Sequence, residues 1–186
     1  MSRVGGRRME LEVSIARKAL RTTSGQTRVV LHDVAFNLRK GEICALLGPS
    51  GCGKTVLLRI ISGLDNDFEG RIVLPSPRRV AIARAFAVKP DLLLLDEPFV
   101  SLDASLAARL REELLALVLK RKATTLIVTH DVEEAVSIAG RIVVLSAAPG
   151  RILADRSIEA PREALTEARA IEMKEEIRSL MANASS

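Results

Sequence analysis

The segment "GPSGCGKT", residues 48–55, carries the strongest chemical signal in the sequence. It fits the pattern G-x-x-x-x-G-K-[ST] and lies between a continuous apolar run and a stretch with helical spacing, as that pattern requires. Its glycines let the backbone bend around an anion, and the start of the following helix favours negative charge. The sequence therefore predicts a nucleotide phosphate site built by Gly48, Pro49, Ser50, Gly51, Cys52, Gly53, Lys54 and Thr55.

A pair of adjacent carboxylates follows a second apolar run, in "LLLLDEP", residues 92–98. In a fold with such a phosphate loop, the carboxylate at the strand end helps to hold Mg²⁺, so we expect Asp96 and the Thr55 hydroxyl to be its protein ligands. The next carboxylate, Glu97, is then placed to take the proton from an attacking water. Lys54 is expected to neutralise the β- and γ-phosphates. These residues predict the hydrolysis of a nucleoside triphosphate.

The elements that must position these residues alternate between strand and helix, which predicts an α/β fold with a mostly parallel core sheet. An N-terminal pair of strands around Ser24-Gly25 predicts a small antiparallel sheet. Further strands are expected at 43–48, 70–74, 91–96, 124–130, 141–146 and 151–155. Helices are expected at 54–62, 78–88, 104–120, 131–139 and, as an amphipathic C-terminal helix, from Pro161 to about Ala182. Ser101 and Asp103 are the candidate caps of the third.

Composition narrows the class of protein. Aromatic residues make up 2% of the chain, which argues against nucleic-acid folds that stack bases on aromatic side chains. The positive charge is concentrated in residues 1–40, where nucleic acid or anionic lipid is a conceivable partner and a solvated basic face is the simpler interpretation. Cys44 and Cys52 form no CxxC pair, so neither a disulfide nor a metal site is expected. With no signal peptide or membrane-length apolar run, we expect a cytoplasmic protein.

Three segments resemble the ATP-binding subunits of ABC transporters: "GPSGCGKTVLLRIISGLD", "RRVAIARAFAVKPDLLLLDEPFVSLD" and "LIVTHDVEEAVSIAGRIVVLS". The resemblance implies a P-loop NTPase fold, with ATP and Mg²⁺ as ligands. It also implies that His130 contacts the γ-phosphate and that Asp103 faces a second ATP-binding subunit. Transmembrane permease subunits would be the other partners, at the inner face of the cell membrane. The tail "LSAAPGRILAD" is similar to importers of the nitrate, sulfonate and taurine type.

The chain departs from that family between residues 74 and 79, where "LPSP" runs directly into "RRVAIARAF". A glutamine-ended core strand, a helical subdomain and an LSGGQ-type signature are expected there, and Gln26 is the only Gln in the sequence. We therefore predict one domain, residues 1–186, with an internal deletion near 74–79 and a helical tail at about 161–183. The family often has an aromatic residue that stacks on adenine near the position of Ala19-Leu20, and this chain has none there. The retained parts predict nucleotide binding, with hydrolysis and coupling impaired.

Three functions remain open from the sequence. The first is an ATPase subunit that powers solute import. The second is a non-hydrolysing nucleotide-binding or regulatory subunit, and ATP turnover separates it from the first. The third is a nucleic-acid-associated P-loop protein, against which the transporter-like segment 124–155 speaks, so no nucleic acid is expected as a partner.

Overall fold

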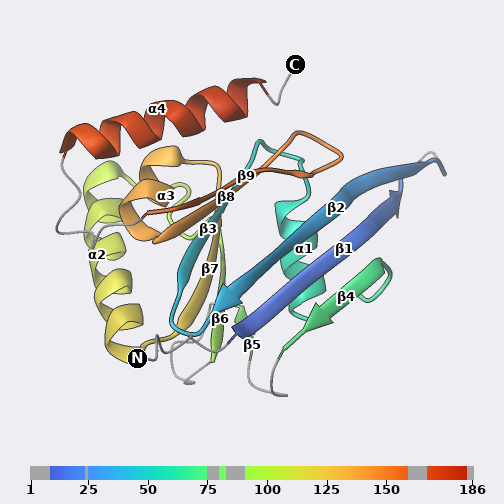
Figure 1. Cartoon of the computed structure of the whole chain (residues 1–186), viewed down its shortest axis with the longest axis horizontal. Helices are drawn as coiled ribbons and strands as arrows, with labels where there is room; N and C mark the ends of the chain where they lie inside the picture. The colour runs from blue at the N-terminus through green and yellow to red at the C-terminus, as the bar shows by residue number, and fades with distance from the viewer. Residues whose placement is uncertain (1–8, 24, 75–79, 83–90, 159–166, 184–186) are drawn as a thin grey trace, which may run out of the picture.

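The computed structural model describes residues 9–23, 25–74, 80–82, 91–158 and 167–183. These residues form two β-sheets with helices packed between and beside them, as Figure 1 shows. The predicted fold class, an α/β protein with a mostly parallel core sheet and a small antiparallel sheet, is confirmed.

The small sheet has three antiparallel strands in the order β2-β1-β4. Its strands are β1 (Met9–Arg21), β2 (Thr27–Arg39) and β4 (Glu69–Val73). Leu11, Val13 and Ile15 alternate along β1 and are buried, so one face of this sheet turns towards the core. The N-terminal strand pair is thus confirmed, and the strand predicted at 70–74 is its third member.

The large sheet has six strands in the order β5-β6-β7-β3-β8-β9, all parallel except β9. Its strands are β3 (Ile43–Leu47), β5 (Val80–Ile82), β6 (Leu92–Asp96), β7 (Thr124–Thr129), β8 (Arg141–Leu145) and β9 (Ile152–Ser157). The strands that lead to Gly48, Glu97 and His130 are therefore neighbours that point the same way. Their C-terminal ends meet at one edge, which is where ligands bind in open α/β sheets.

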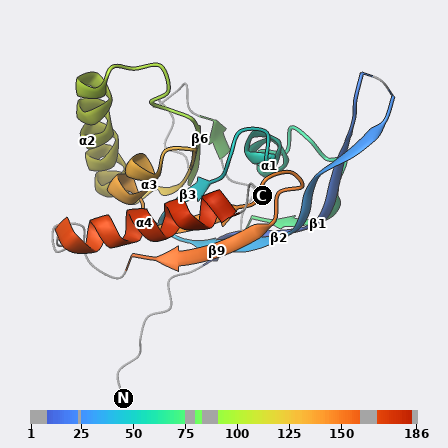
Figure 2. The ribbon, with the colours of Figure 1, turned by 90° about the horizontal axis from the view of Figure 1, so that it is seen from above.

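Both faces of the large sheet are covered by helices, which are α1 (Lys54–Ile61), α2 (Ala104–Arg121), α3 (Val132–Ile138) and α4 (Glu167–Asn183). Along β6, Leu92 and Leu94 pack into the core that contains α1 and the small sheet, whereas Leu93 and Leu95 pack against α2. Figure 2 shows α1 on the side of β1 and β2, with α2 and α3 on the other side. A strand buried on both faces explains the continuous apolar run.

The helix predicted over residues 78–88 is wrong at Val80–Ile82, which form β5 and pair in parallel with β6. Residues 78, 79 and 83–88 lie outside the described part of the chain. The apolar residues here have helical spacing, but pairing with β6 prevails. Without β5, the backbone N–H and C=O groups on the outer edge of β6 would lack strand partners. Val and Ile are β-branched and favour the strand.

The C-terminal helix is confirmed over Glu167–Asn183, where Met173 and Ile177 are buried against α3 and β8. Its predicted first turn at Pro161, like the junction at 75–79, lies outside the described residues. Among the described residues, no helix has both the length and the apolar character needed to cross a membrane.

Candidate functional site

The loop at residues 48–55 joins β3 to α1 in a conformation that needs glycine. Gly53 caps the start of α1 with a φ of 104°, and Gly51 has a φ of 78°, a region that L side chains rarely adopt. A side chain at Gly53 would also meet Leu31, because a Cβ there would lie 2.7 Å from Leu31 Cδ2. The backbone N–H groups at the start of α1 are therefore open to an anion.

Lys54 lies over this loop rather than in solvent, with 7% of its surface exposed. Its Nζ donates to the carbonyl oxygens of Gly48 at 2.7 Å and Pro49 at 3.1 Å. The same Nζ lies 3.9 Å from Glu97 Oε1. One positive charge is thus held between the phosphate loop and the carboxylate that sequence reasoning assigned as a base.

Thr55 and Asp96 meet as the sequence predicted. Thr55 Oγ1 donates to Asp96 Oδ2 at 3.0 Å, which joins the first turn of α1 to the end of β6. A hydroxyl and a carboxylate oxygen at this spacing are hard oxygen donors, the kind that Mg²⁺ prefers alongside phosphate oxygens and water. The residues present therefore fit the predicted metal.

Glu97 is held in a sparsely populated backbone conformation, with a φ of 48°. Its N–H donates to Val128 O at 2.9 Å, so the backbone after β6 is fastened to β7. Its Oε2 lies 2.7 Å from His130 Nδ1. Glu97 thus stands between Lys54 on one side and His130 on the other, with 27% of its side chain exposed.

Glu134, in the first turn of α3, is a buried carboxylate that sequence reasoning missed. Thr129 Oγ1 donates to Glu134 Oε2 at 2.8 Å and accepts from the N–H of Asp131 at 3.0 Å. Burial raises the pKa of Glu134, and the nearby Asp131 carboxylate raises it further. The pair fixes the turn that leads from β7 through His130 into α3. The signal available in the sequence was a Glu in the first turn of a short helix, which by itself suggests only a dipole contact.

The raised pKa of Glu134 predicts a pH dependence of folding stability. The folded chain holds the Glu134 proton more tightly than the unfolded chain does, so protonated Glu134 adds to the free energy of unfolding. This stabilisation is complete below about pH 4.3, the ordinary pKa of Glu, and is lost as the pH rises through the folded-state pKa. Glu134→Gln keeps an oxygen for Thr129 but does not ionise. We expect the variant to gain stability over the native chain between pH 5 and pH 8, as measured by urea unfolding. Glu112→Gln, at an exposed position of α2, is the control and should not gain.

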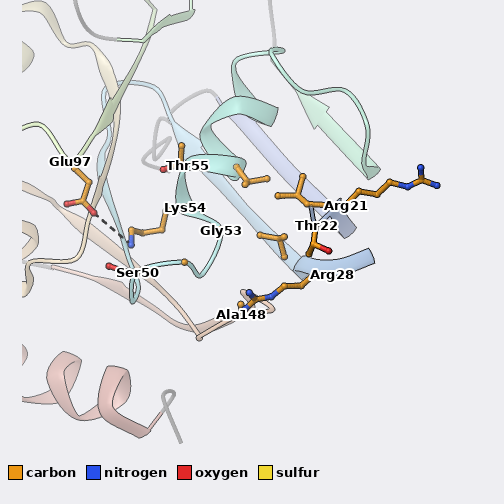
Figure 3. A pocket seen from close by; sticks show the side chains of 13 residues that line it. Arg21, Thr22, Arg28, Ser50, Gly53, Lys54, Thr55, Glu97 and Ala148 are labelled. Carbon is orange, nitrogen blue, oxygen red and sulfur yellow. Dashed lines mark ion pairs between the residues drawn. The ribbon is translucent and has the colours of Figure 1, made fainter. Parts of the chain in front are cut away.

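A cavity of about 510 Å³ opens along the phosphate loop, and Figure 3 shows the side chains that line it. One end is formed by residues of the loop and the strand ends: Ser50, Gly51, Gly53, Lys54, Thr55, Val56 and Glu97. The other end is formed by the β1–β2 hairpin and the loop after β8: Leu20, Arg21, Thr22, Arg28, Val30 and Ala148. No aromatic side chain is among these lining residues, as the sequence led us to expect near Leu20.

Asp103 is placed as a helix cap. Its carboxylate accepts from Leu106 N–H at 2.9 Å and from Ser105 Oγ at 2.7 Å, which confirms the predicted cap of α2. These two hydrogen bonds hold the pKa of Asp103 below its usual range. Asp103 is exposed and does not line the cavity, so its predicted role towards a second subunit stays a prediction.

Cys52 is a packing residue of the loop. It is fully buried, and that burial raises the pKa of its thiol, which fits a small loop side chain and not a nucleophile. Cys44 is likewise free and buried.

The loop after β8 supports the phosphate loop from behind. Gly150 donates to Val30 O at 2.8 Å and accepts from His32 N–H at 3.0 Å. A Cβ at Gly150 would collide with the carbonyl oxygen of Cys52, which is backbone and cannot swing aside. The C-terminal hairpin, β2 and the phosphate loop therefore meet at one point.

Gly150→Ala is expected to strain this contact by about 1–3 kcal/mol, as overpacking of a well-packed core does. For a chain of this size the melting temperature should fall by about 2–4 °C for each kcal/mol. Thermal unfolding measures the loss. Gly140→Ala is the matched control, because a Cβ there would meet its nearest neighbour, Ile43 O, only at 3.9 Å. Equal melting temperatures for the two variants would contradict the close contact.

The sequence of this chain is similar to those of known proteins. The family described as ABC transporter matches residues 31–78. The aliphatic sulfonates import ATP-binding protein SsuB of a Bacillus cereus strain is 34% identical over 191 aligned residues, covering 66% of this chain and 76% of the relative. The protein SsuB 1 of Pseudomonas savastanoi pv. phaseolicola is 33% identical over 214, covering 82% and 88%.

Solved structures show the same fold. The ATP-binding cassette MJ0796, in a dimeric post-hydrolysis state bound to ADP and Pi, superposes with a TM-score of 0.70 at 16% identity, covering 81% of this chain and 100% of that chain. CbiO1 of Clostridium perfringens, part of the ABC transporter complex CbiONQ, superposes with a TM-score of 0.67 at 17% identity, covering 89% and 94%.

Proposed function

Because this chain belongs to the ABC transporter family of ATP-binding proteins, we propose that it is the ATP-binding subunit of an importer and binds Mg²⁺-ATP to power solute uptake. By resemblance it is an ATP hydrolase of the ABC type. The observation that carries the proposal is the convergence at one sheet edge. Lys54, Thr55 and Glu97 line a single cavity, and Asp96 and His130 contact two of them directly.

The phosphate chain of ATP is proposed to lie along the loop, under the N–H groups at the start of α1 and beside the Lys54 ammonium. Thr55 and Asp96 would hold Mg²⁺, which supplies charge neutralisation on the phosphate oxygens. Hydrogen bonds to phosphate would replace those that Lys54 now makes to Gly48 and Pro49. Charge-assisted contacts of this kind are roughly twice as strong as neutral ones.

Glu97 is proposed to orient the attacking water and accept its proton at Oε1 or Oε2. Lys54 and His130 flank the carboxylate at 3.9 Å and 2.7 Å, so it is kept in one orientation beside the phosphate loop. His130 donates or accepts at Nδ1, and its other ring nitrogen is proposed to contact the γ-phosphate. Glu134 and Thr129 fix the backbone that carries His130.

We further propose that the chain lacks the glutamine loop, the helical subdomain and the signature of its family. Only five residues separate Leu74, after β4, from Val80 at the start of β5, which is too short a connection for a subdomain. The alignment with the Pseudomonas relative supports this shortening. It runs over 214 positions although it covers only 82% of a 186-residue chain, so the relative has residues that this chain lacks.

The proposed loss of the signature determines which partners the chain would need. A second ATP-binding subunit with its own signature would complete the site, in an assembly with transmembrane permease subunits at the inner face of the membrane. A homodimer of this chain offers two phosphate loops and no signature, because the sequence contains no Ser-Gly-Gly. Alone, the chain is then expected to bind nucleotide and hydrolyse it slowly, since nothing closes on the γ-phosphate. The alternative, a non-hydrolysing regulatory subunit, shares the binding and differs in turnover.

The test compares binding with turnover in the purified chain. Calorimetry with Mg²⁺-ATP should show binding at one site, and phosphate release should stay close to the uncatalysed level. Adding a full-length family member should raise phosphate release. Absence of any nucleotide binding would refute the proposed function, whereas binding with no turnover in any assembly would favour the regulatory alternative.

A further inference from the structure

The end of the cavity farthest from Lys54 is formed by one face of the β1–β2 hairpin. Leu20 and Arg28 are directly opposite each other in the strand register, so their side chains emerge on the same face. Val30 lies two residues beyond Arg28 on β2, at the register shift opposite Lys18 and Ala19. All three line the cavity.

Arg21 and Arg28 lie at nearly equivalent positions on the two sides of the β1–β2 turn, but their side chains point in different directions. Figure 3 shows the Arg28 side chain running along the cavity towards Ala148, while the guanidinium of Arg21 extends away from the phosphate loop. Arg21 follows Leu20 directly and also lines the cavity, so the direction of its guanidinium is what distinguishes it from Arg28. Among the described residues, Arg28 has no ion-pair partner.

We propose that Arg28 and Leu20 form the base subsite of this cavity, with the Arg28 guanidinium plane stacking on the nucleobase and Leu20 supplying apolar contact. The inference rests on the proposed function, because the base is placed by a triphosphate bound at the loop. A cavity of about 510 Å³ is within the range that holds drug-sized ligands. The described residues of the lining include no aromatic ring, and guanidinium is the other planar group that stacks on bases.

The hairpin is held against the phosphate loop, so this subsite has a fixed position. A Cβ at Gly53 would lie 3.0 Å from Val30 Cγ1, and Gly150 N–H donates to Val30 O at 2.8 Å. Val30 is thus packed between the two loops, and Arg28 precedes it by two residues along β2. Stacking recognises the π-face that every base offers, so adenine and guanine should be bound equally well.

The experiment measures the binding of Mg²⁺-ATP, Mg²⁺-GTP and inorganic tripolyphosphate by calorimetry. Arg28→Ala should weaken ATP and GTP about tenfold, the usual scale for one stacked base, and leave tripolyphosphate unchanged. Arg39→Ala removes the same charge from the far end of β2, where Arg39 is exposed and is not among the residues that line the cavity, and should change none of the three. Arg28→Lys keeps the charge without the plane and should weaken ATP nearly as much as Arg28→Ala.

Three results would overturn the base subsite. Equal weakening of ATP and tripolyphosphate by Arg28→Ala would make Arg28 a phosphate ligand. Native affinity in Arg28→Lys would show that charge suffices, and native ATP affinity in Arg28→Ala would exclude any contact. Each of these leaves the proposed function intact, whereas a native chain that binds neither ATP nor tripolyphosphate would refute both. Equal melting temperatures of the Arg28 and Arg39 variants establish that folding is unchanged.

Discussion

Lys54→Ala is expected to abolish nucleotide binding. The ammonium is the one cationic side chain that the structure places directly over the described phosphate loop, 2.7 Å from Gly48 O and 3.9 Å from Glu97 Oε1. Removing it eliminates several charge-assisted contacts to phosphate at once, each worth about 1.5–3 kcal/mol. It also leaves Glu97 facing the phosphates without a nearby cation. Calorimetry with Mg²⁺-ATP should show a loss of at least about 100-fold in affinity.

Lys40→Ala provides the comparison, since Lys40 is an exposed residue in the turn after β2. Its removal lowers the net charge of the chain by the same amount, so any general electrostatic effect on an anionic ligand would appear in both variants. If the Lys54 and Lys40 variants bound ATP alike, the phosphates would have to lie elsewhere.

Glu97→Gln is expected to lower the rate of hydrolysis by about 10²–10⁴, the usual contribution of a general base, and to keep nucleotide binding. Gln has the shape of Glu and retains a hydrogen-bonding group for His130, so the architecture at the ends of β6 and β7 should survive. Phosphate release from the assembly with a full-length partner is the measurement. Glu112→Gln on the exposed face of α2 serves as the control.

The same variant also tests the effect of the shortened junction. If the isolated chain releases phosphate at about 1 s⁻¹, within the usual range of enzymes, and its Glu97→Gln variant does not, then the proposed loss of the signature does not disable hydrolysis. A background rate in both proteins is the expected result.

The phosphate end of the site was predictable from the sequence because its parts are local. Residues 48–55 bring their own strand, loop and helix, and Asp96, Glu97 and His130 each follow an apolar run that had to be a buried strand. Parallel neighbouring strands then place these strand ends together, without any further information.

The hairpin end of the cavity was not predictable, because a register shift decides which residues line it. Leu11, Val13 and Ile15 set an odd-numbered inward face on β1, yet Lys18 is buried and Leu20 lines the cavity. The pairing between β1 and β4 shifts between Ile15 and Arg17, before Lys18, and a shift of one residue exchanges the two faces of a strand. Alternation counted from Leu11 would have turned Leu20 outward.

Long-range contacts account for the other differences. Strand β5 was predicted as helix because the free edge of β6 is visible only in the folded sheet. The support of Cys52 by Gly150 joins residues far apart in sequence, and no local pattern announces it.

The contact of Gly150 with the phosphate loop and β2 has a consequence for how much folded protein a cell would contain. Nucleotide bound to the loop would restrain three distant stretches together, since β2, the start of α1 and the C-terminal hairpin meet there. A ligand that binds only the folded state adds about 2.7 kcal/mol of stability at one hundred times its Kd, a large part of the roughly 5–15 kcal/mol that holds a typical domain folded. Even without turnover, ATP would then act as a structural component, and depletion of nucleotide would expose the chain to unfolding and proteolysis.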